Sequence, residues 1–520
     1  MRMGKGKGKV FLVGAGPGDP RLVTVKGLEA IRQSDAIVYD RLAGPRLLRH
    51  ARADAEMYYV GKMPDRHTMK QEEINRLLVE LALQGKTVTR LKGGDPSVFG
   101  RVGEEAEELA KHGVPFEIVP GVTSAIAVPV YAGIPVTHRD LNTSFTVVTG
   151  HERPDRIDTQ IPWQQLAANQ DTIVFLMGVS NIRHICAQLM SHGRPPDTPV
   201  ALVRWGTRVE QETITGTLSD IADAVERARF QPPAVIIVGE VVRLRDKIQW
   251  FEHMPLFGRR VLVTRSRAQT SELADKVDAM GGEAVEFPVI QLSAQSDPRE
   301  LEAIREAIDH IERYHWILFT SVNGVIYFFQ FMKQFRRDIR SLHGARIAAV
   351  GPKTREALED LGFVVEELPS NFQQEGLLEL VLGKLRPGER ILLPKSAIAR
   401  SILPDGLRRN GYELTELSVY DNRLVDEGAD EAARMLREGE VDVITFTSSS
   451  TVRNFFEIMK RYEDDPNRLI GRALTACIGP VTARTAKEVG MKVDIVAGES
   501  TIDSLLDAIV SHFRGSSSSD

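Results

Sequence analysis

The sequence contains little cysteine and no long apolar run. Its two cysteines, Cys186 and Cys477, lie far apart without a ligand-type neighbour, which disfavours both a disulfide framework and a thiolate metal site. No stretch approaches the ~18 apolar residues that a membrane-spanning helix needs. The apolar run Val10–Val13 is also shorter than the roughly 7–15 residues of a secretory signal. We therefore expect a cytoplasmic protein with no metal site and no membrane partner.

The sequence also has only a small excess of charge of one sign, and it lacks a nucleoside-triphosphate-binding loop. The formal net charge of -5 argues against a nucleic-acid partner, although it leaves room for a local basic pocket. Because no Gly-Lys-Ser/Thr sequence occurs, a nucleoside-triphosphate enzyme is disfavoured. With 42% hydrophobic and 26% charged residues in 520, the chain is typical of a globular protein. At ~150 residues per domain, this length predicts roughly three to four compact units.

From residue 9 to about 252, short apolar runs alternate with amphipathic helical patterns, which predicts an α/β domain. The pattern breaks around 139–143, so we divide this region into lobes 9–139 and 143–252 with a cleft between them. The expected strands are Val10–Val13, Ala36–Tyr39, Thr87–Leu91, Phe145–Thr149, Thr172–Leu176 and Ala234–Val238. The expected helices are one from a Thr24 cap to Gln33, Gln71–Leu83 and Glu104–Lys111.

A second break at 252–258 precedes a new α/β series, which extends over 258–513 and contains an internal repeat. The two copies are 260–385 and 390–513, and residues 514–520 are expected to form a disordered tail. Three segment pairs match in the same order: Arg260–Ser266 with Arg390–Ser396, Thr320–Phe329 with Thr447–Phe456, and Ile347–Gly362 with Thr475–Gly490. The duplication predicts two similar α/β lobes with a ligand in the groove between them.

Three loops rich in glycine and small residues follow expected strands, at the sheet edge where open α/β proteins bind ligands. Gly14–Pro20 (GAGPGDP) is compatible with a structural turn, a dinucleotide site or another nucleoside-like ligand. Asp19 stands where a dinucleotide fingerprint requires glycine. Arg90–Arg101 (RLKGGDPSVFGR) allows close backbone approach to a ligand. In Pro120–Ala127 (PGVTSAIA), Thr123 is either a ligand contact or a helix cap.

These motifs together resemble those of uroporphyrinogen-III C-methyltransferase across 9–252. The matching segments, in order, are GAGPGDP, VYDRL (38–42), VGK (60–62), RLKGGDPSVFGR, PGVTSAIAVP, AGIPVTHR, FLMG (175–178), RWGT (204–207) and VGEVV (238–242). Val102 departs from the glycine usual in that family. Residues 258–513 resemble uroporphyrinogen-III synthase through the paired Thr-Ser and Gly-Pro-x-Thr motifs and SVYD (418–421).

The first resemblance implies a tetrapyrrole-methylase fold that binds S-adenosylmethionine between its lobes and methylates uroporphyrinogen III twice, at C2 and C7, to give precorrin-2. It implies a homodimer through this half. Asp40 would accept a proton, and Lys62 would donate one or contact substrate. The implied cofactor contacts are Pro17, Gly93, Gly94, Asp95, Val98, Thr123, Ser124, Met177 and Gly206. Because the macrocycle carries eight carboxylates, we expect a basic cleft mouth, with Arg41, Arg101, His138 and Arg139 as candidates.

The second resemblance implies two lobes joined by a pair of extended segments, with the first strand–helix unit packed beside the second half. This half would cyclise hydroxymethylbilane to uroporphyrinogen III without metal or cofactor, mainly by holding a flexible substrate in a reactive shape. Tyr420 would assist loss of the hydroxyl group. The candidate substrate contacts are Thr264, Ser266, Thr320, Ser321, Thr354, Ser396, Thr447 and Ser448.

Alternative interpretations remain at this stage. The C-terminal half could be a non-catalytic tetrapyrrole-binding or regulatory module, because two-lobed folds often host binding functions. Residues 9–250 could instead belong to a dinucleotide oxidoreductase. Several individual residues also have structural alternatives: Asp40 as a turn cap, Met177 as core, Lys62 as a solvated charge, Tyr420 as a buried structural tyrosine, and the hydroxyl residues as helix caps.

Overall fold

The computed structural model describes residues 7–61, 69–150, 160–265, 267–365, 367–397 and 401–517. Over these residues it forms four five-stranded sheets flanked by helices, which confirms the expected α/β class. The chain divides into two compact units: unit 1 comprises Met1–Arg260 with Lys276–Glu283, and unit 2 comprises Val261–Asp275 with Ala284–Asp520. No helix within the described ranges has both the length and the apolar character required to cross a membrane.

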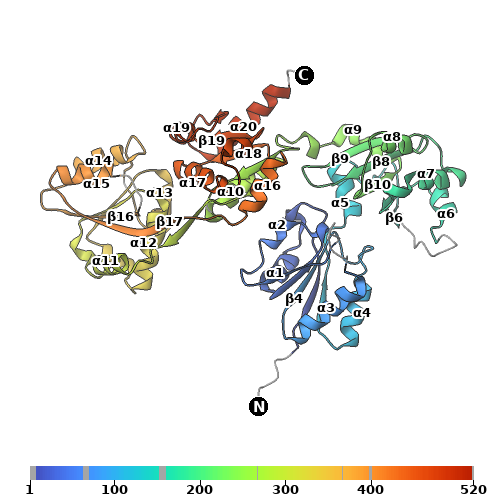
Figure 1. Ribbon diagram of the computed structural model, residues 1–520, viewed down its shortest axis with the longest axis horizontal. Helices are drawn as coiled ribbons and strands as arrows, with labels where there is room; N and C mark the ends of the chain where they lie inside the picture. Colours follow the sequence, from blue (N-terminus) through green and yellow to red (C-terminus); the bar gives the residue numbers. More distant parts are fainter. Residues whose placement is uncertain are drawn as a thin grey trace, which may run out of the picture. The chain divides into compact units, whose positions relative to one another are not determined.

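The first lobe of unit 1 is a parallel sheet between two helical layers. Its strand order is β3-β2-β4-β1-β5. In Figure 1, α1 and α2 lie on one face of this sheet and α3 and α4 on the other. The strands are β1 Val10–Gly14, β2 Ala36–Tyr39, β3 Glu56–Tyr59, β4 Val88–Lys92 and β5 Phe116–Val119, and the helices are α1 Val25–Gln33, α2 Pro45–Leu48, α3 Gln71–Leu83 and α4 Val102–Lys111.

The second lobe of unit 1 has a mixed sheet in the order β6-β7-β10-β8-β9. Helix α5 (Ser124–Tyr131) packs Ala125 and Val128 against one face of it, while α6, α7 and α8 cover the other. The strands are β6 Phe145–Thr149, β7 Thr172–Leu176, β8 Pro199–Arg204, β9 Glu212–Thr217 and β10 Ala234–Val238, and the helices are α6 Trp163–Ala168, α7 Ile182–Ser191, α8 Ile221–Arg227 and α9 Arg245–Ile248.

Strands and helices with strong patterns match their expected ranges closely. Strands β2, β6, β7 and β10 and helix α3 have the predicted bounds, and Thr24 caps α1 by accepting the N–H of Gly27 at 3.1 Å. Helix α4 begins at Val102, two residues before the expected start.

In unit 2, one lobe is inserted into the other. The outer lobe has strand order β12-β11-β18-β19-β20 and is built from chain segments on both sides of the insertion. Its strands are β11 Arg260–Val263, β12 Glu283–Glu286, β18 Val443–Phe446, β19 Leu474–Cys477 and β20 Ile495–Val496. Its helices are α10 Arg267–Ala279, whose residues from Lys276 onward belong to unit 1, α16 Ala429–Arg437, α17 Ser449–Met459, α18 Pro466–Ile470, α19 Pro480–Glu488 and α20 Ile502–Ser517. Helix α20 therefore extends past residue 513, where we expected the tail to begin.

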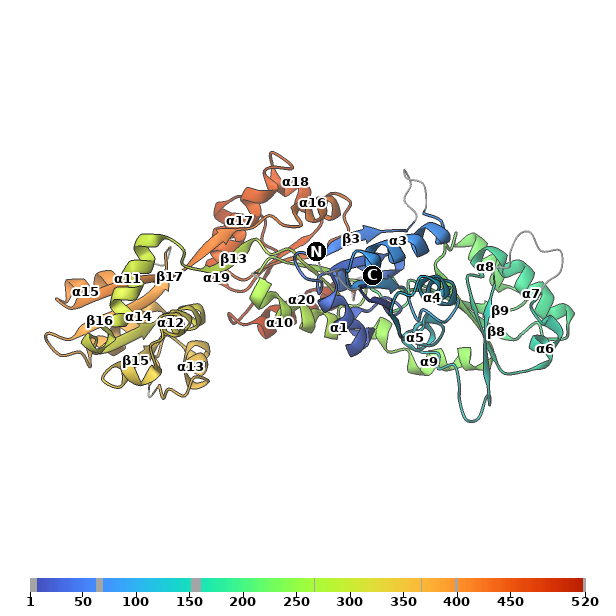
Figure 2. The same cartoon turned by 90° about the horizontal axis from the view of Figure 1, so that it is seen from below.

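The inner lobe is one continuous segment, 290–424, with strand order β13-β17-β16-β14-β15. The antiparallel strands β13 and β17 form the connection between the two lobes (Figure 2). The strands are β13 Ile290–Ala294, β14 Trp316–Phe319, β15 Arg346–Ala349, β16 Arg390–Ser396 and β17 Glu413–Leu424. The helices are α11 Pro298–Asp309, α12 Val322–Gln334, α13 Pro352–Glu359, α14 Gln374–Leu382 and α15 Ile402–Arg409.

The two sequence repeats do not coincide with these lobes. Strand β11, which begins the first repeat, pairs in parallel with β18 of the second. Strand β16, which begins the second repeat, pairs with β14 of the first. Each lobe thus contains two strands from the other copy, β11 and β12 in the outer lobe and β16 and β17 in the inner lobe. The exchange of the first strand–helix unit agrees with what the resemblance to the synthase implied.

Candidate active sites

Unit 1 contains a cavity of about 370 Å³ that reaches both of its lobes. This volume falls in the range of small-molecule sites, about 300–1,000 Å³. Of the cofactor contacts expected from the sequence, seven line it, and so do the expected catalytic residue Asp40 and the basic residue Arg101. The seven are Pro17, Gly93, Gly94, Val98, Ser124, Met177 and Gly206.

Three glycines bring the loops of the first lobe into backbone contact. Gly16 and Gly94 exchange hydrogen bonds at 3.2 and 2.7 Å. A Cβ atom on Gly121 would lie 2.4 Å from the carbonyl oxygen of Gly94 and 2.7 Å from Cα of Gly14. A side chain at Gly121 would therefore separate the loops, whereas Gly16 and Gly94 adopt positive φ of 77° and 70°, which favours glycine.

The loop after β1 does not have dinucleotide-site geometry. Asp19 caps a short 3-10 turn, Pro20–Leu22, and accepts the hydroxyl of Tyr131 at 3.0 Å. The following helix, α1, begins only at Val25. The glycine loop therefore presents no long-helix N-terminus to a pyrophosphate, which removes the basis of the dinucleotide interpretation.

Backbone strain is concentrated around the same cavity. Non-glycine residues with positive φ include Phe99 (53°), Arg101 (60°), Met177 (59°) and Trp205 (46°), all of which line it. Strained residues gather at ligand sites when the surrounding structure holds them there. Met177 is 54% exposed, so the interpretation of this residue as plain core is wrong.

A buried charged cluster holds Asp40 in the cavity wall. Arg90 donates to Oδ2 of Asp40 at 3.1 Å, and the N–H of Leu42 donates to Oδ1 at 3.0 Å. Behind them, fully buried Glu105 accepts from Lys92 at 2.7 Å and from Arg90 at 3.4 Å. Burial, together with neighbouring Arg90, lowers the pKa of Lys92 despite the opposing effect of Glu105.

Two expected cofactor contacts, Asp95 and Thr123, do not line the cavity but hydrogen-bond the backbone of the loops and of α5. Asp95 accepts the N–H groups of Ser97 at 2.7 Å and Gly121 at 2.9 Å. Burial alone would raise the pKa of Asp95, but hydrogen bonds from Ser97 and Gly121 lower it. Thr123 caps α5 by accepting the N–H of Ala125 at 3.3 Å, which is the helix-cap interpretation.

Three of the four expected basic residues lie outside the cavity lining. The guanidinium of exposed Arg41 lies 5.6 Å from the ring centroid of Trp205. His138 accepts the N–H of Asp140 at 3.3 Å, and Arg139 is exposed. Lys62 lies outside the described residues.

Sequence reasoning missed several lining residues: Arg90, Lys92, Trp205 and Arg208. Arg90 and Lys92 alternate along β4, so their shared face could have been read from the strand pattern. Trp205 and Arg208 carry no such local signal.

Unit 2 contains a second cavity, of about 270 Å³. It lies along the connecting strands, with Ile290 and Leu292 from β13 and Tyr420 and Asn422 from β17. Tyr420 hydrogen-bonds Ser321 through the two hydroxyl oxygens at 3.2 Å and stacks on Tyr327 at 5.5 Å between ring centroids. Burial raises the pKa of Tyr420, although the hydrogen bond with Ser321 opposes it.

The other expected contacts in unit 2 differ in where the structure places them. Thr447 and Ser448 line the cavity. Thr264 is fully buried and donates to the carbonyl of Thr445 at 2.7 Å, a structural role. Among the remaining candidates, Thr320 is half-buried, while Thr354 and Ser396 are buried, and all three are away from the cavity lining. Ser266 lies outside the described residues.

The sequence did not single out Arg265, Asn323, Asn422, Ser450 and Thr451, which also line this cavity. Arg265 brings a positive charge, and burial lowers its pKa despite the opposing effect of Glu272. The buried Oδ1 of Asn422 makes no hydrogen bond to the part of the chain that the structure describes. Arg265 is next to Thr264, and Ser450 is two residues after Ser448, both of which were expected substrate contacts. Including the neighbours of the repeated motifs could therefore have found Arg265 and Ser450.

These features define an α/β enzyme with a separate cavity in each of its two units. Residues 9–222 match the family model of tetrapyrrole (corrin/porphyrin) methylases, and residues 271–507 match that of uroporphyrinogen-III synthase HemD. The porphyrin biosynthesis protein HemD of Ruminiclostridium josui is 39% identical over 504 residues, covering 97% of this chain and 98% of that protein. The chain thus belongs to the tetrapyrrole methylase family in its N-terminal half and to the uroporphyrinogen-III synthase HemD family in its C-terminal half.

Two further relatives match the N-terminal half alone. The uroporphyrinogen-III C-methyltransferase of Priestia megaterium is 57% identical over 235 residues, 45% of this chain and 98% of that protein. A crystal structure of uroporphyrin-III C-methyl transferase from Thermus thermophilus, complexed with S-adenyl homocysteine, is 40% identical. It covers 46% of this chain and 100% of its own, with a TM-score of 0.40.

Proposed function

We propose that the protein is a bifunctional enzyme of tetrapyrrole biosynthesis. Its C-terminal half cyclises hydroxymethylbilane to uroporphyrinogen III, and its N-terminal half methylates that product at C2 and C7 to precorrin-2. The observation that carries the proposal is that residues from five separate sequence motifs line one cavity together with Asp40. The two family matches and the nearly full-length relative support the combination of both activities in one chain.

S-adenosylmethionine is the proposed methyl donor, and it supplies an electrophilic sulfonium methyl group. The unit 1 cavity suits such a ligand because glycine backbone at 93–94 and Gly206 leave room for a nucleoside beside apolar Val98 and Met177. A Cβ atom on Gly206 would lie 2.4 Å from Cγ1 of Val128, so a larger residue would disturb this wall.

Asp40 is the proposed proton acceptor of methyl transfer. Attack by a pyrrole carbon leaves a cationic ring that must lose a proton, and a carboxylate facing the cavity can take it. Arg90 and the N–H of Leu42 fix both oxygens of Asp40, so the group is oriented before substrate arrives. Arg101 on the cavity wall is suited to a carboxylate of the macrocycle.

In unit 2, Tyr420 is the proposed donor that assists departure of the hydroxyl group. Its raised pKa keeps the phenol protonated, and the hydroxyls of Thr447 and Ser448 line the same cavity for substrate carboxylates. A linear substrate bound between two lobes is held close to its reactive shape, which lowers the entropic part of the barrier.

The proposal extends to a cytoplasmic homodimer formed through the methyltransferase half, with domains at 9–252 and 258–513. Its test supplies purified full-length protein with hydroxymethylbilane, with and without S-adenosylmethionine, and identifies the products by chromatography and mass. We expect isomer III without the cofactor and a doubly methylated product with it. If only isomer I forms, while added uroporphyrinogen III is still methylated, the C-terminal half is a binding module and the synthase proposal fails.

A further inference from the structure

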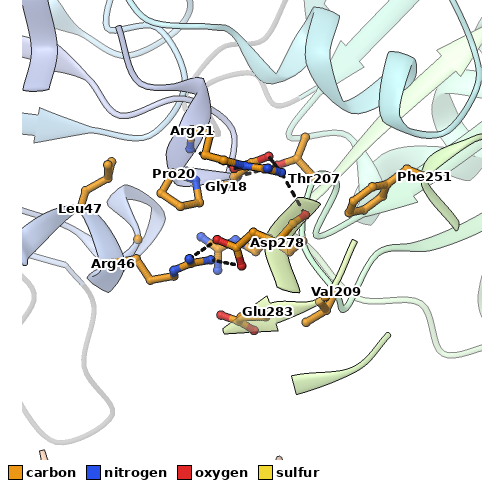
Figure 3. A pocket seen from close by; sticks show the side chains of 14 residues that line it. Gly18, Pro20, Arg21, Arg46, Leu47, Thr207, Val209, Phe251, Asp278 and Glu283 are labelled. Atoms are coloured by element: carbon orange, nitrogen blue, oxygen red, sulfur yellow. Dashed lines mark hydrogen bonds and ion pairs between the residues drawn. The ribbon is translucent and has the colours of Figure 1, made fainter. Parts of the chain in front are cut away.

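Unit 1 has a second, smaller pocket of about 60 Å³ (Figure 3). It shares one lining residue with the 370 Å³ cavity, here called the cofactor cavity because the proposed function places the methyl donor in it. Its arginines and acids are largely paired with one another. Arg46 forms an ion pair with Asp278, whose backbone carbonyl accepts from Arg21 at 3.2 Å. Arg21 also pairs with Asp19 at 3.2 Å. Glu283 is bound by Arg260 at 2.7 Å.

Arg208 lines both this pocket and the cofactor cavity. Among the described residues, no carboxylate lies within ion-pair distance of its guanidinium. Glu210 and Glu283 influence Arg208 electrostatically, but Arg260 binds both of them. The guanidinium of Arg208 instead lies over the aromatic ring of Trp205, 4.9 Å from the ring centroid.

The surroundings of Arg208 destabilise the charged form of its guanidinium. Burial lowers the pKa of Arg208, and nearby Arg41 and Arg260 act in the same direction. The guanidinium of Arg41 lies over the same indole at 5.6 Å. Two guanidinium groups on one ring repel each other, and a carboxylate placed between them would relieve this repulsion.

The chain is also shaped to hold the Arg208 side chain in this position. A Cβ atom on Gly18 would lie 2.9 Å from Cγ and Nε of Arg208, so glycine is needed where the side chain crosses the loop. Trp205 and Thr207 adopt positive φ of 46° and 72°. This strained turn immediately precedes Arg208. The backbone thus accepts strain and close packing around an arginine to which the described part of the chain supplies no counter-ion.

We propose that Arg208 is a carboxylate-binding residue of the methyltransferase site. The inference rests on the proposed function, and it adds a ligand contact at a position outside the motifs that carry the family resemblance. Two ligands of that reaction offer a carboxylate: the amino-acid end of the methyl donor and the acidic side chains of the macrocycle. A planar guanidinium binds either one through two parallel hydrogen bonds.

The test compares the full-length wild type with Arg208→Gln and with the control Arg227→Gln, an exposed arginine on α8 of the same unit. Calorimetry gives the affinities for S-adenosylhomocysteine and for 5′-methylthioadenosine, which lacks the carboxylate. Steady-state methylation gives the KM for uroporphyrinogen III. Thermal melting and the cyclisation rate report on folding and on unit 2.

We expect Arg208→Gln either to bind S-adenosylhomocysteine at least tenfold more weakly or to raise the KM for uroporphyrinogen III at least tenfold. Weaker S-adenosylhomocysteine binding with unchanged methylthioadenosine binding assigns Arg208 to the cofactor; a raised KM alone assigns it to the macrocycle. The proposal is overturned if the two nucleoside affinities and the KM all match those of the control within twofold. It is also overturned if the affinities for both nucleosides fall equally, because an equal fall indicates a distorted cavity. If Arg208→Gln does not fold, Arg208→Lys, which keeps the charge but loses the planar fork, is expected to show a smaller loss of the same kind. A wild type that binds neither nucleoside would instead overturn the proposed function.

Discussion

At the residue scale, one polar side chain in each unit is held by neighbours so that it faces a cavity. Asp40 is fixed by Arg90 and by a backbone N–H, and Tyr420 by Ser321 and by stacking on Tyr327. Because the two residues lie in different units, a substitution at either one should change only one of the two reactions. This independence makes both proposed roles testable in the full-length chain.

Asp40→Asn is expected to lower the methylation rate by about 100-fold or more, the usual scale for losing a general base. The amide keeps the size of the side chain but cannot accept a proton at neutral pH. The rate of cyclisation by the same preparation should stay within twofold of wild type. Asp54→Asn, an exposed carboxylate of the same lobe, is the control. Loss of both activities in a folded Asp40→Asn protein would contradict the assignment.

Tyr420→Phe is expected to slow cyclisation by up to about tenfold, the scale of one hydrogen bond of ~0.5–1.5 kcal/mol. Since burial raises the pKa of Tyr420 above its ordinary value of 10.0, the phenol stays protonated as pH rises and wild-type activity should persist up to that pH. The ratio of isomers III and I, measured from pH 7 to 10, checks both points. Tyr327→Phe keeps the stacked ring and serves as control; an equal loss there would argue for packing alone.

At the element scale, the loops that follow β1, β4 and β5 are fastened to one another through backbone. The Gly16–Gly94 hydrogen bonds and the carboxylate of Asp95 join these loops. One wall of the unit 1 cavity is therefore held together by contacts within the protein.

Gly121→Ala is expected to destabilise unit 1 by about 1–3 kcal/mol, the usual cost of overpacking. The added methyl would lie 2.4 Å from the carbonyl oxygen of Gly94. We expect S-adenosylhomocysteine affinity to fall at least tenfold by calorimetry and the melting temperature to fall with it. Gly103→Ala, whose methyl would meet no atom within 4 Å, should bind like wild type. Equal affinity of the two variants would show that loop contact is unimportant.

Local patterns predict elements and motif-borne residues well, but not contacts made by folding. The short apolar run Ala36–Tyr39 and the helical periodicity of Gln71–Leu83 predicted β2 and α3 with their observed bounds. Met177 and Gly206 were placed in the cavity through resemblance alone. Trp205 and Arg208 were missed because their surroundings come from distant segments: Arg41 lies over Trp205, and Gly18 and Gly44 lie beside Arg208. For the same reason, nothing local distinguishes Thr264, which is buried, from Thr447, which lines a cavity.

At the scale of the whole molecule, the duplication predicted two similar lobes in unit 2, and the resemblance to the synthase implied that the first strand–helix unit packs beside the second half. The structure agrees with this exchange and forms the inner lobe from the single segment 290–424. Sequence similarity reveals that the segment is duplicated, but it does not reveal which strands of the two copies pair in one sheet. Strands β11 and β16 are alike in sequence and occupy corresponding places in opposite sheets.

Two fragments of similar length should therefore behave differently. Fragment 290–424 contains every strand of its sheet and is expected to fold, with a cooperative thermal melt and dispersed amide resonances. Fragment 390–513, the second sequence repeat, contains β18, β19 and β20 but lacks β11, their partner in the outer sheet, and should remain unfolded. Cooperative melting of 390–513, or an unfolded 290–424, would contradict this account of unit 2.

The pairing of β11 with β18 also affects how the chain is made. Val261 must find Val443, which a ribosome adds about 180 residues later. At the ~5–20 residues per second of protein synthesis, this delay lasts roughly 9–36 s. The inner lobe is complete before then, so nascent unit 2 passes through a stage with one finished lobe and one strand whose hydrogen-bonding edge is open. Such an edge can pair with another chain, and during synthesis it is the part of unit 2 most in need of a chaperone.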